Sequence, residues 1–154
     1  TPWFKYVKSH YDAGTYHDTV GDLGNHILSV MKMIGFQNTA QVDDTWVRAY
    51  SSPFPTREEC IGAIEFPLDA LEGRVLAYRE EGMAMVDKLK AKPAMLAVGM
   101  MDGAIDPEVM FADFEALFPD APIVRLPNAG HFCQEDAPGT LIALIQQFMQ
   151  MSVS

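Results

Sequence analysis

The chain has 154 residues, of which 49% are hydrophobic, and its 21 acidic and 11 basic residues give a net charge of −10. This composition is typical of one globular domain, and the negative charge argues against nucleic acid or an anionic membrane surface as a partner. The apolar stretches are too short or too interrupted by polar residues to span a bilayer, so we expect no transmembrane helix.

The chain opens at Thr1 and Pro2 with neither an initiator Met nor the basic, apolar and small residues of a signal peptide. We therefore expect that a further segment precedes it. Our expectation is a cytoplasmic protein, although a targeting signal could lie in that preceding segment.

Residues 1 to about 70 show only short helical patterns, such as Ile27, Val30, Met31 and Ile34, separated by glycines and by the turn sequence SSPFP at 51–55. This indicates several short helices joined by loops. A longer helix is predicted over 68–89, and Gly73 and Gly82 can divide it in two.

A different pattern begins after Lys92. The apolar run 94–98, which follows Pro93 and ends at Gly99, predicts a strand buried on both faces. Asp106 and Pro107 are typical of an N-cap and a first helical residue. The spacing predicts a helix over 107–118 with Met110, Phe114 and Leu117 inward, a strand over 123–126, and a helix over 138–151 that buries Leu141, Ile145 and Phe148.

Two strands joined by a helix are expected to lie parallel in one sheet. A parallel pair has two strand edges, and it needs neighbouring strands to satisfy its backbone groups. No repeat or low-complexity segment in this sequence can supply them. We therefore expect a partner segment that provides the rest of the sheet.

Polar side chains follow both predicted strands, at the end where α/β sheets bind ligands. Asp102 comes three residues after Gly99, and His131 follows the second strand. A carboxylate at this edge can accept the Nδ1 proton of an imidazole and so hold a catalytic histidine. This pair would be half of a catalytic triad.

Alternatives exist for both residues. His131 could be a loop residue that caps the last helix, but Gly130 allows a sharp turn before it and Phe132 offers an apolar wall beside it. Asp106 competes as the acid, although its N-cap position already gives it a structural role, whereas Asp102 shows none. The remaining histidines lack such surroundings: His10, His17 and His26.

The runs KPAMLAVGMMDGAIDPEVM and FPDAPIVRLPNAGHFCQEDAP resemble the C-terminal region of α/β-hydrolases, and the GHFxQED ending is most similar to haloalkane dehalogenases. Upstream, AYSSPFPTREECIGAIEFP resembles the segment in which the cap of those enzymes returns to the main domain. The resemblance covers about residues 45 to 150. It implies an α/β-hydrolase fold, with a helical cap and its return over 1–90 and the last two parallel strands with their helices over 91–154.

The resemblance also implies the chemistry. Asp102 would be the triad acid and His131 the general base, while the nucleophile, an aspartate that forms an alkyl-enzyme ester, would lie in the N-terminal half that this chain needs as its partner. This chain alone would then be inactive. An epoxide hydrolase, a fluoroacetate dehalogenase, an esterase acting on a small ester, and a non-catalytic α/β module remain alternatives.

Haloalkane dehalogenases bind the leaving halide with a Trp beside the nucleophile and a second Trp or Asn. The segment from Met31 to Phe36 has no Trp for the second position, so Trp46 is the nearest candidate and Asn38 a weaker one, with Phe132 as a wall of the substrate pocket.

Other polar and sulfur-containing residues are assigned structural roles. Gln134 and Glu135 are interpreted as braces of the histidine loop or of the last helix. Cys60 and Cys133 are expected to be reduced structural thiols. No metal-ligand, phosphate-binding or nucleotide motif occurs in the sequence, so no cofactor is expected.

Overall fold

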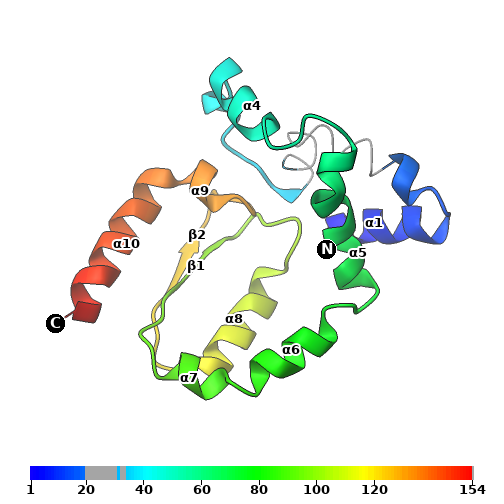
Figure 1. Ribbon diagram of the computed structural model, residues 1–154. Helices are drawn as coiled ribbons and strands as arrows, with labels where there is room; N and C mark the ends of the chain where they lie inside the picture. The colour runs from blue at the N-terminus through cyan, green and yellow to red at the C-terminus, as the bar shows by residue number, and fades with distance from the viewer. Residues whose placement is uncertain (20–30, 32–33, 154) are drawn as a thin grey trace.

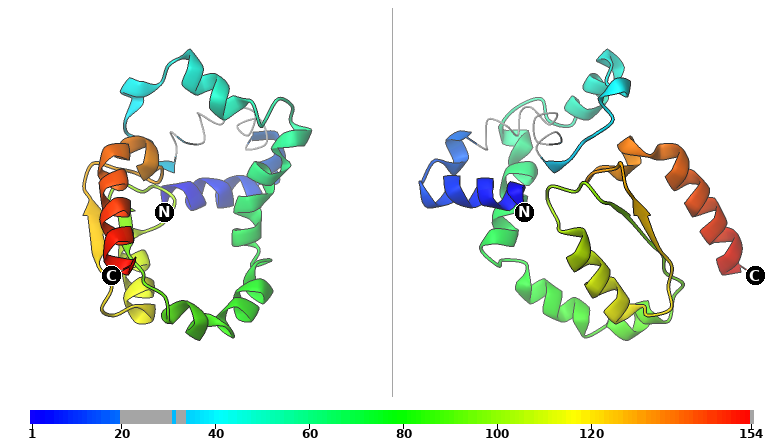
Figure 2. Two further views of the ribbon diagram at one scale, coloured as in Figure 1. Left: turned by 60° about the vertical axis from the view of Figure 1, so that its left-hand side comes forward. Right: turned by 180° about the vertical axis from the view of Figure 1, so that it is seen from behind.

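The computed structural model describes residues 1–19, 31 and 34–153. The elements in chain order are α1 (Pro2–Asp12), the 3-10 helix η1 (Thr39–Gln41), α4 (Asp44–Ser51), the 3-10 helix η2 (Glu58–Cys60), α5 (Ile61–Leu71), α6 (Leu76–Met83), α7 (Val86–Lys90), β1 (Leu96–Gly99), α8 (Pro107–Leu117), β2 (Ile123–Leu126), α9 (Cys133–Asp136) and α10 (Pro138–Val153). Helices α5, α6 and α7 form an arc that leads back to the sheet (Figures 1 and 2).

The two strands form a parallel pair, as predicted. Leu96 aligns with Ile123 at one end of the pair and Gly99 with Leu126 at the other. Helix α8 connects the strands, and the sheet lies between α8 and α10 (Figures 1 and 2). The order of strand, helix, strand and helix is therefore confirmed.

Burial of β1 differs from the prediction. Val98 and Gly99 are buried, but Leu96 and Ala97 are only half-buried. The reason is the small size of the sheet: among the described residues β1 pairs with β2 alone. A strand that is apolar on both faces is thus covered only at its carboxyl end.

Helix α8 begins as its sequence predicts. The Asp106 side chain accepts a hydrogen bond from the Glu108 N–H at 3.0 Å, and Pro107 occupies the first helical position. Phe111 is the buried residue of this helix, whereas the predicted inward residues, Met110, Phe114 and Leu117, are half-buried. The Arg125 guanidinium from β2 lies 4.2 Å from the centroid of the Phe111 ring, so a cation–π contact helps join helix and sheet.

Helix α10 confirms the predicted span but not every predicted contact. Leu141, Leu144 and Phe148 are half-buried, whereas Ile145 is 56% exposed. The prediction for Ile145 is therefore wrong. The inward stripe uses spacings of three and four residues, and Leu144 takes the position that was expected for Ile145.

The helix predicted over 68–89 is also corrected. Helix α5 starts earlier, at Ile61, and contains Pro67, because burial of Ile64 and Leu68 against α1 outweighs the hydrogen bond that proline removes. The break expected at Gly73 is present, and this glycine has a φ of +71°, which favours a residue without Cβ. Gly82, by contrast, lies inside α6.

The main buried cluster joins α1 and α5 to a loop that follows β1. All but one of its members come from the first 68 residues, and the last lies in the loop after β1: Trp3, Val7, Tyr16, Ile34, Cys60, Ile64, Leu68 and Ala104. The start of α1 is fixed to the same loop, since the Trp3 N–H is donated to the Gly103 carbonyl at 3.2 Å. The helical segment therefore rests directly on the loop that carries Asp102. A division into a cap and a core part near residue 90 remains a prediction.

Some residues of the sequence predictions lie outside the described part of the chain. These are Ile27 and Val30 of the predicted short helix, and His26. Met31 and Ile34 of the same predicted helix are described and are buried.

Within the part of the chain that the structure describes, no helix combines the length and apolarity required to cross a membrane. Cys60 and Cys133 form no disulfide, as expected.

Candidate active site

The pairing of the two strands continues into the loops that follow them. The Met100 N–H is donated to the Leu126 carbonyl at 3.0 Å, and the Met101 N–H to the Ala129 carbonyl at 2.9 Å. Because the two segments remain hydrogen-bonded to each other past the strand ends, the residues that follow in each segment lie close together. These next residues include Asp102 and His131.

Asp102 and His131 form a hydrogen-bonded pair. The His131 Nδ1 lies 2.9 Å from the Asp102 Oδ2, and the side chains are 31% and 6% exposed, respectively. The expected contact between the two strand ends is therefore present. Asp106, the alternative acid, instead caps α8, so the geometry pairs His131 with Asp102.

The second oxygen of Asp102 has a structural role that the sequence analysis did not find. Oδ1 accepts hydrogen bonds from the N–H groups of Ala104 at 2.7 Å and Ile105 at 3.0 Å. The expectation that Asp102 lacks a structural role is thus wrong. These two backbone donors fix the carboxylate, which leaves Oδ2 aimed at the imidazole.

The contact determines which ring nitrogen of a neutral His131 carries the proton. A carboxylate only accepts hydrogen bonds, so Nδ1 must be the protonated nitrogen. Nε2 then keeps its lone pair and can accept a proton. The arrangement is suited to a general base held in one tautomer.

Phe132 lies against both the histidine and the buried cluster. Its ring packs edge-on to the His131 imidazole, with centroids 5.2 Å apart, and it contacts the cluster of α1 and α5. One side of the imidazole therefore faces an apolar ring, as the sequence analysis proposed. Whether Phe132 also lines a substrate pocket remains a prediction.

Trp46 donates its indole N–H to the Glu135 Oε2 at 2.8 Å, and its ring stacks on Phe36 with centroids 5.4 Å apart. This N–H is the only hydrogen-bond donor of the indole. Trp46 would have to release Glu135 before it could bind a halide. The weaker candidate, Asn38, directs its side-chain amide to the Glu135 carbonyl at 3.5 Å.

Glu135 connects α9 to α4 and η1. Besides Trp46, its carboxylate accepts hydrogen bonds from the Tyr50 hydroxyl and from the Gln41 amide, the latter at 3.2 Å. Burial, followed by the hydrogen bond to Glu135, raises the pKa of Tyr50 to about 12. The prediction that Glu135 braces the histidine loop or the start of the last helix is therefore corrected, because its carboxylate binds side chains of α4 and η1.

Asp136 is a connecting residue that the sequence analysis missed. Its Oδ1 accepts hydrogen bonds from the N–H groups of Gln37 at 2.8 Å and Asn38 at 2.7 Å, and its Oδ2 accepts one from Gly130 at 2.7 Å. No local pattern reveals this, because two of the partners lie 99 and 98 residues away. The acidic QED sequence after the histidine was the only available signal.

Three backbone segments, which contain Gly35, Gly99 and Gly130, pack closely beside the Asp102–His131 pair. A Cβ on Gly130 would lie 1.7 Å from the Gly35 carbonyl oxygen, and one on Gly99 would lie 2.1 Å from the Gly130 carbonyl oxygen. Gly35 itself has a φ of +115°. These positions require glycine, since any side chain would occupy the space of a neighbouring backbone.

Two hollows in the described part of the chain lie away from the pair. One of about 720 Å³ is bordered by α7, the loop 118–122 and α10, and one of about 420 Å³ is bordered by β2 and the start of α10. Neither is lined by Asp102 or His131. A cavity over the pair, covered by residues 1 to 70, therefore stays a prediction. Among the described residues, no group of three or more His, Cys, Asp or Glu side chains could hold a metal ion.

The other histidines have surface surroundings. His10 Nδ1 lies 3.0 Å from the Thr15 hydroxyl and its ring contacts Tyr6, while His17 packs edge-on to Tyr16. His26 is outside the described residues. His131 is therefore the histidine that the structure places beside a buried carboxylate within the described part of the chain.

The structure contains a parallel strand–helix–strand unit, with an acid and a histidine at neighbouring strand ends, and a helical segment precedes this unit. This arrangement corresponds to part of an α/β-hydrolase fold.

Comparison with known proteins identifies relatives within this class of fold. The chain is 40% identical over 84 residues to haloalkane dehalogenase 2 of Mycobacterium tuberculosis and, equally, to haloalkane dehalogenase 2 of Mycobacterium bovis. Each match covers 54% of this chain and 29% of the relative, and no family model matches. The chain is thus homologous to a part of these haloalkane dehalogenases.

Proposed function

We propose that this chain contributes the acid and the base of a haloalkane dehalogenase-type hydrolase, with Asp102 as the acid and His131 as the base. The observation that carries the proposal is the hydrogen bond of 2.9 Å between the Asp102 carboxylate and the His131 Nδ1 at neighbouring strand ends. The partial identity to haloalkane dehalogenase 2 supports the halogenated substrate class.

The proposed reaction has two steps. A carboxylate nucleophile attacks the carbon that bears the halogen, a carbon–oxygen bond forms, and the halide leaves with the electron pair of the carbon–halogen bond. In the second step His131 Nε2 removes a proton from water, and the hydroxide attacks the carbonyl carbon of the ester. The carbon–oxygen bond to the alkoxide then breaks, the alkoxide takes the proton back from His131 and leaves as the alcohol, and the carboxyl group releases its proton to solvent and becomes the carboxylate again. Covalent catalysis thus divides a difficult displacement into two easier steps.

Asp102 would support the second step without touching the substrate. Its carboxylate orients the imidazole and stabilises the positive charge that develops when His131 takes the proton from water. The Ala104 and Ile105 N–H groups keep the carboxylate in place during this change. Asp102 is therefore a positioning residue for the base.

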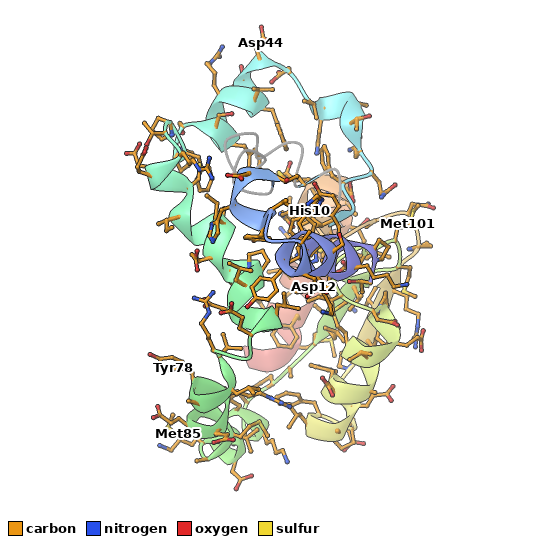
Figure 3. The ribbon with its side chains drawn as sticks, turned by 90° about the vertical axis from the view of Figure 1, so that its right-hand side faces the viewer. His10, Asp12, Asp44, Tyr78, Met85 and Met101 are labelled. Carbon is orange, nitrogen blue, oxygen red and sulfur yellow. The ribbon has the colours of Figure 1, made fainter. Side chains whose placement is uncertain are left out.

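We further propose that the nucleophile belongs to an N-terminal partner segment of the same hydrolase, which also completes the sheet. The described residues offer surfaces that such a segment could cover, because neither α6 nor α7 buries any residue. Tyr78 is 78% exposed and Met85 54% exposed, and Figure 3 shows both at the end of the molecule opposite Asp44.

The test is halide release from short bromoalkanes by this chain co-expressed with the nucleophile-bearing segment. We expect multiple-turnover halide release that is lost in His131→Ala and retained in the matched control His10→Ala, whose Nδ1 lies against the Thr15 hydroxyl and whose ring contacts Tyr6. Halide release over many turnovers in His131→Ala would contradict the role given to this residue. Hydrolysis of small esters without halide release would instead indicate an esterase.

A further inference from the structure

Asp136 lies five residues after His131 and joins three separate parts of the chain. One oxygen of its carboxylate accepts the Gly130 N–H at 2.7 Å, immediately before His131. The other oxygen accepts the Gln37 and Asn38 N–H groups at 2.8 and 2.7 Å. Both oxygens are therefore occupied by backbone donors.

The segment 34–38 also contacts the loop of Asp102. The Ile34 carbonyl accepts the Gly103 N–H at 2.8 Å. A Cβ on Gly35 would lie 2.9 Å from the Met101 carbonyl oxygen and 3.3 Å from the His131 backbone nitrogen. The segment thus touches the loops of both members of the pair.

These hydrogen bonds connect the segments in a ring. The Asp102 loop is bonded to the segment 34–38, this segment is bonded to Asp136, and Asp136 is bonded to Gly130, which precedes His131. The imidazole of His131 is in turn bonded to Asp102. We propose that Asp136 is a positioning residue for catalysis, which fixes the backbone of the His131 loop so that Nδ1 remains on Asp102. The proposal rests on the proposed function, since it presumes that His131 acts as the base.

The chemistry of the contacts favours a carboxylate at this position. Three N–H donors converge on two acceptor oxygens, whereas an asparagine has one acceptor oxygen and an NH₂ group that would face an N–H donor. Asp136→Asn therefore breaks either the bond to Gly130 or the pair of bonds to Gln37 and Asn38. The substitution keeps the size of the side chain almost unchanged.

The first experiment is NMR on the co-expressed enzyme with the 154-residue chain isotopically labelled, observing the His131 imidazole nitrogens and the Nδ1 proton. We expect the hydrogen-bonded Nδ1–H signal in the natural chain, its loss in Asp136→Asn, and its retention in the matched control Glu135→Gln. Glu135 occupies the preceding position of α9 but holds α4 instead of the His131 loop. Retention of the signal in Asp136→Asn, or its loss in both variants, would overturn the proposal.

A second measurement needs no variant and so remains decisive if Asp136→Asn fails to fold. Hydrogen exchange of the Gly130 amide should be strongly slowed in the natural chain, because its N–H is donated to Asp136. Exchange at the rate of an unprotected amide would overturn the proposal.

The third readout is kinetic and separates this proposal from the proposed function. In the co-expressed enzyme, Asp136→Asn should lower kcat roughly 10²-fold through a misplaced base and change KM little. A lower kcat with the Nδ1–H signal lost supports the positioning role, and an unchanged kcat overturns it. Absence of halide release from the natural enzyme would refute the dehalogenase function, while the NMR and exchange results still test the role of Asp136.

Discussion

At the residue scale, Asp102 divides its two oxygens between two tasks. Oδ1 closes a turn through the N–H groups of Ala104 and Ile105, and Oδ2 contacts the imidazole of His131. The turn fixes the side chain before any substrate is present. This preorganisation is what allows a carboxylate to select one tautomer of a histidine.

A pair of substitutions distinguishes the two acids that the sequence left in competition. Asp102→Asn should lower the hydrolytic rate of the co-expressed enzyme by roughly 10²–10⁴-fold, because an amide NH₂ no longer accepts the Nδ1 proton. Asp106→Asn should leave the rate unchanged, since asparagine caps a helix about as well as aspartate. Steady-state kinetics measures both effects, and equal losses in the two variants would contradict the assignment.

Gly130→Ala tests the close contact between the histidine loop and Gly35. The added Cβ would lie 1.7 Å from a carbonyl oxygen, so backbone must move, and we expect the free energy of unfolding to fall by roughly 2–3 kcal/mol or more. The control is Gly62→Ala in α5, where nothing lies within 4 Å, and here stability should stay equal or rise slightly. Urea denaturation measures both, and a fully stable Gly130→Ala variant would disprove the contact.

Some residues of the site could be predicted from the sequence, whereas others could not because their partners lie far away in the chain. Asp102 and His131 could be predicted because strand ends are recognisable and parallel strands end at one edge. Asp136 could not, because its role depends on the segment 34–38, which only the folded chain brings near. Trp46 shows the same limit, since nothing local predicts that Glu135 takes its N–H.

At the scale of elements, strong local signals gave the most accurate predictions. The strand 123–126 and the start of α8 agree with the sequence because prolines and an N-cap mark their ends. The helix predicted over 68–89 begins earlier in the structure, as α5 at Ile61, and Pro67 lies inside it. Packing of α5 on α1, a tertiary effect, keeps this proline within a helix.

The packing of α1 and α5 around Tyr16 predicts a loss of stability at alkaline pH. The Tyr16 hydroxyl is donated to the Ile64 carbonyl at 2.5 Å, and burial raises the pKa of Tyr16 from 10.0 to about 12. The unfolded chain loses this proton near pH 10 and the folded chain only near pH 12, so the free energy of unfolding should fall as the pH rises through this window.

Urea denaturation at several pH values across that window measures the effect. Tyr16→Phe should reduce the alkaline loss, and part of it should remain because the pKa of Tyr50 is also raised to about 12. Tyr78→Phe, at a position that is 78% exposed, is the matched control and should leave the pH dependence unchanged. An alkaline loss of the same size in Tyr16→Phe would contradict this explanation.

At the scale of the whole molecule, the described residues place the Asp102–His131 pair at the end of a sheet of two strands. Large apolar side chains are exposed along α6, α7 and α10, including Leu76, Leu89 and Met149. Clusters of exposed apolar residues commonly mark interaction surfaces. This distribution agrees with the proposal that a partner segment completes the sheet and supplies the nucleophile.

The central claim is that His131 activates water for the second step and is not required for the first. Rapid-mixing measurement of halide release by the co-expressed enzyme carrying His131→Gln tests it most directly. We predict a burst of about one halide per active site followed by almost no turnover, because the ester forms but is not hydrolysed. Continued turnover at the rate of the natural enzyme would contradict the claim.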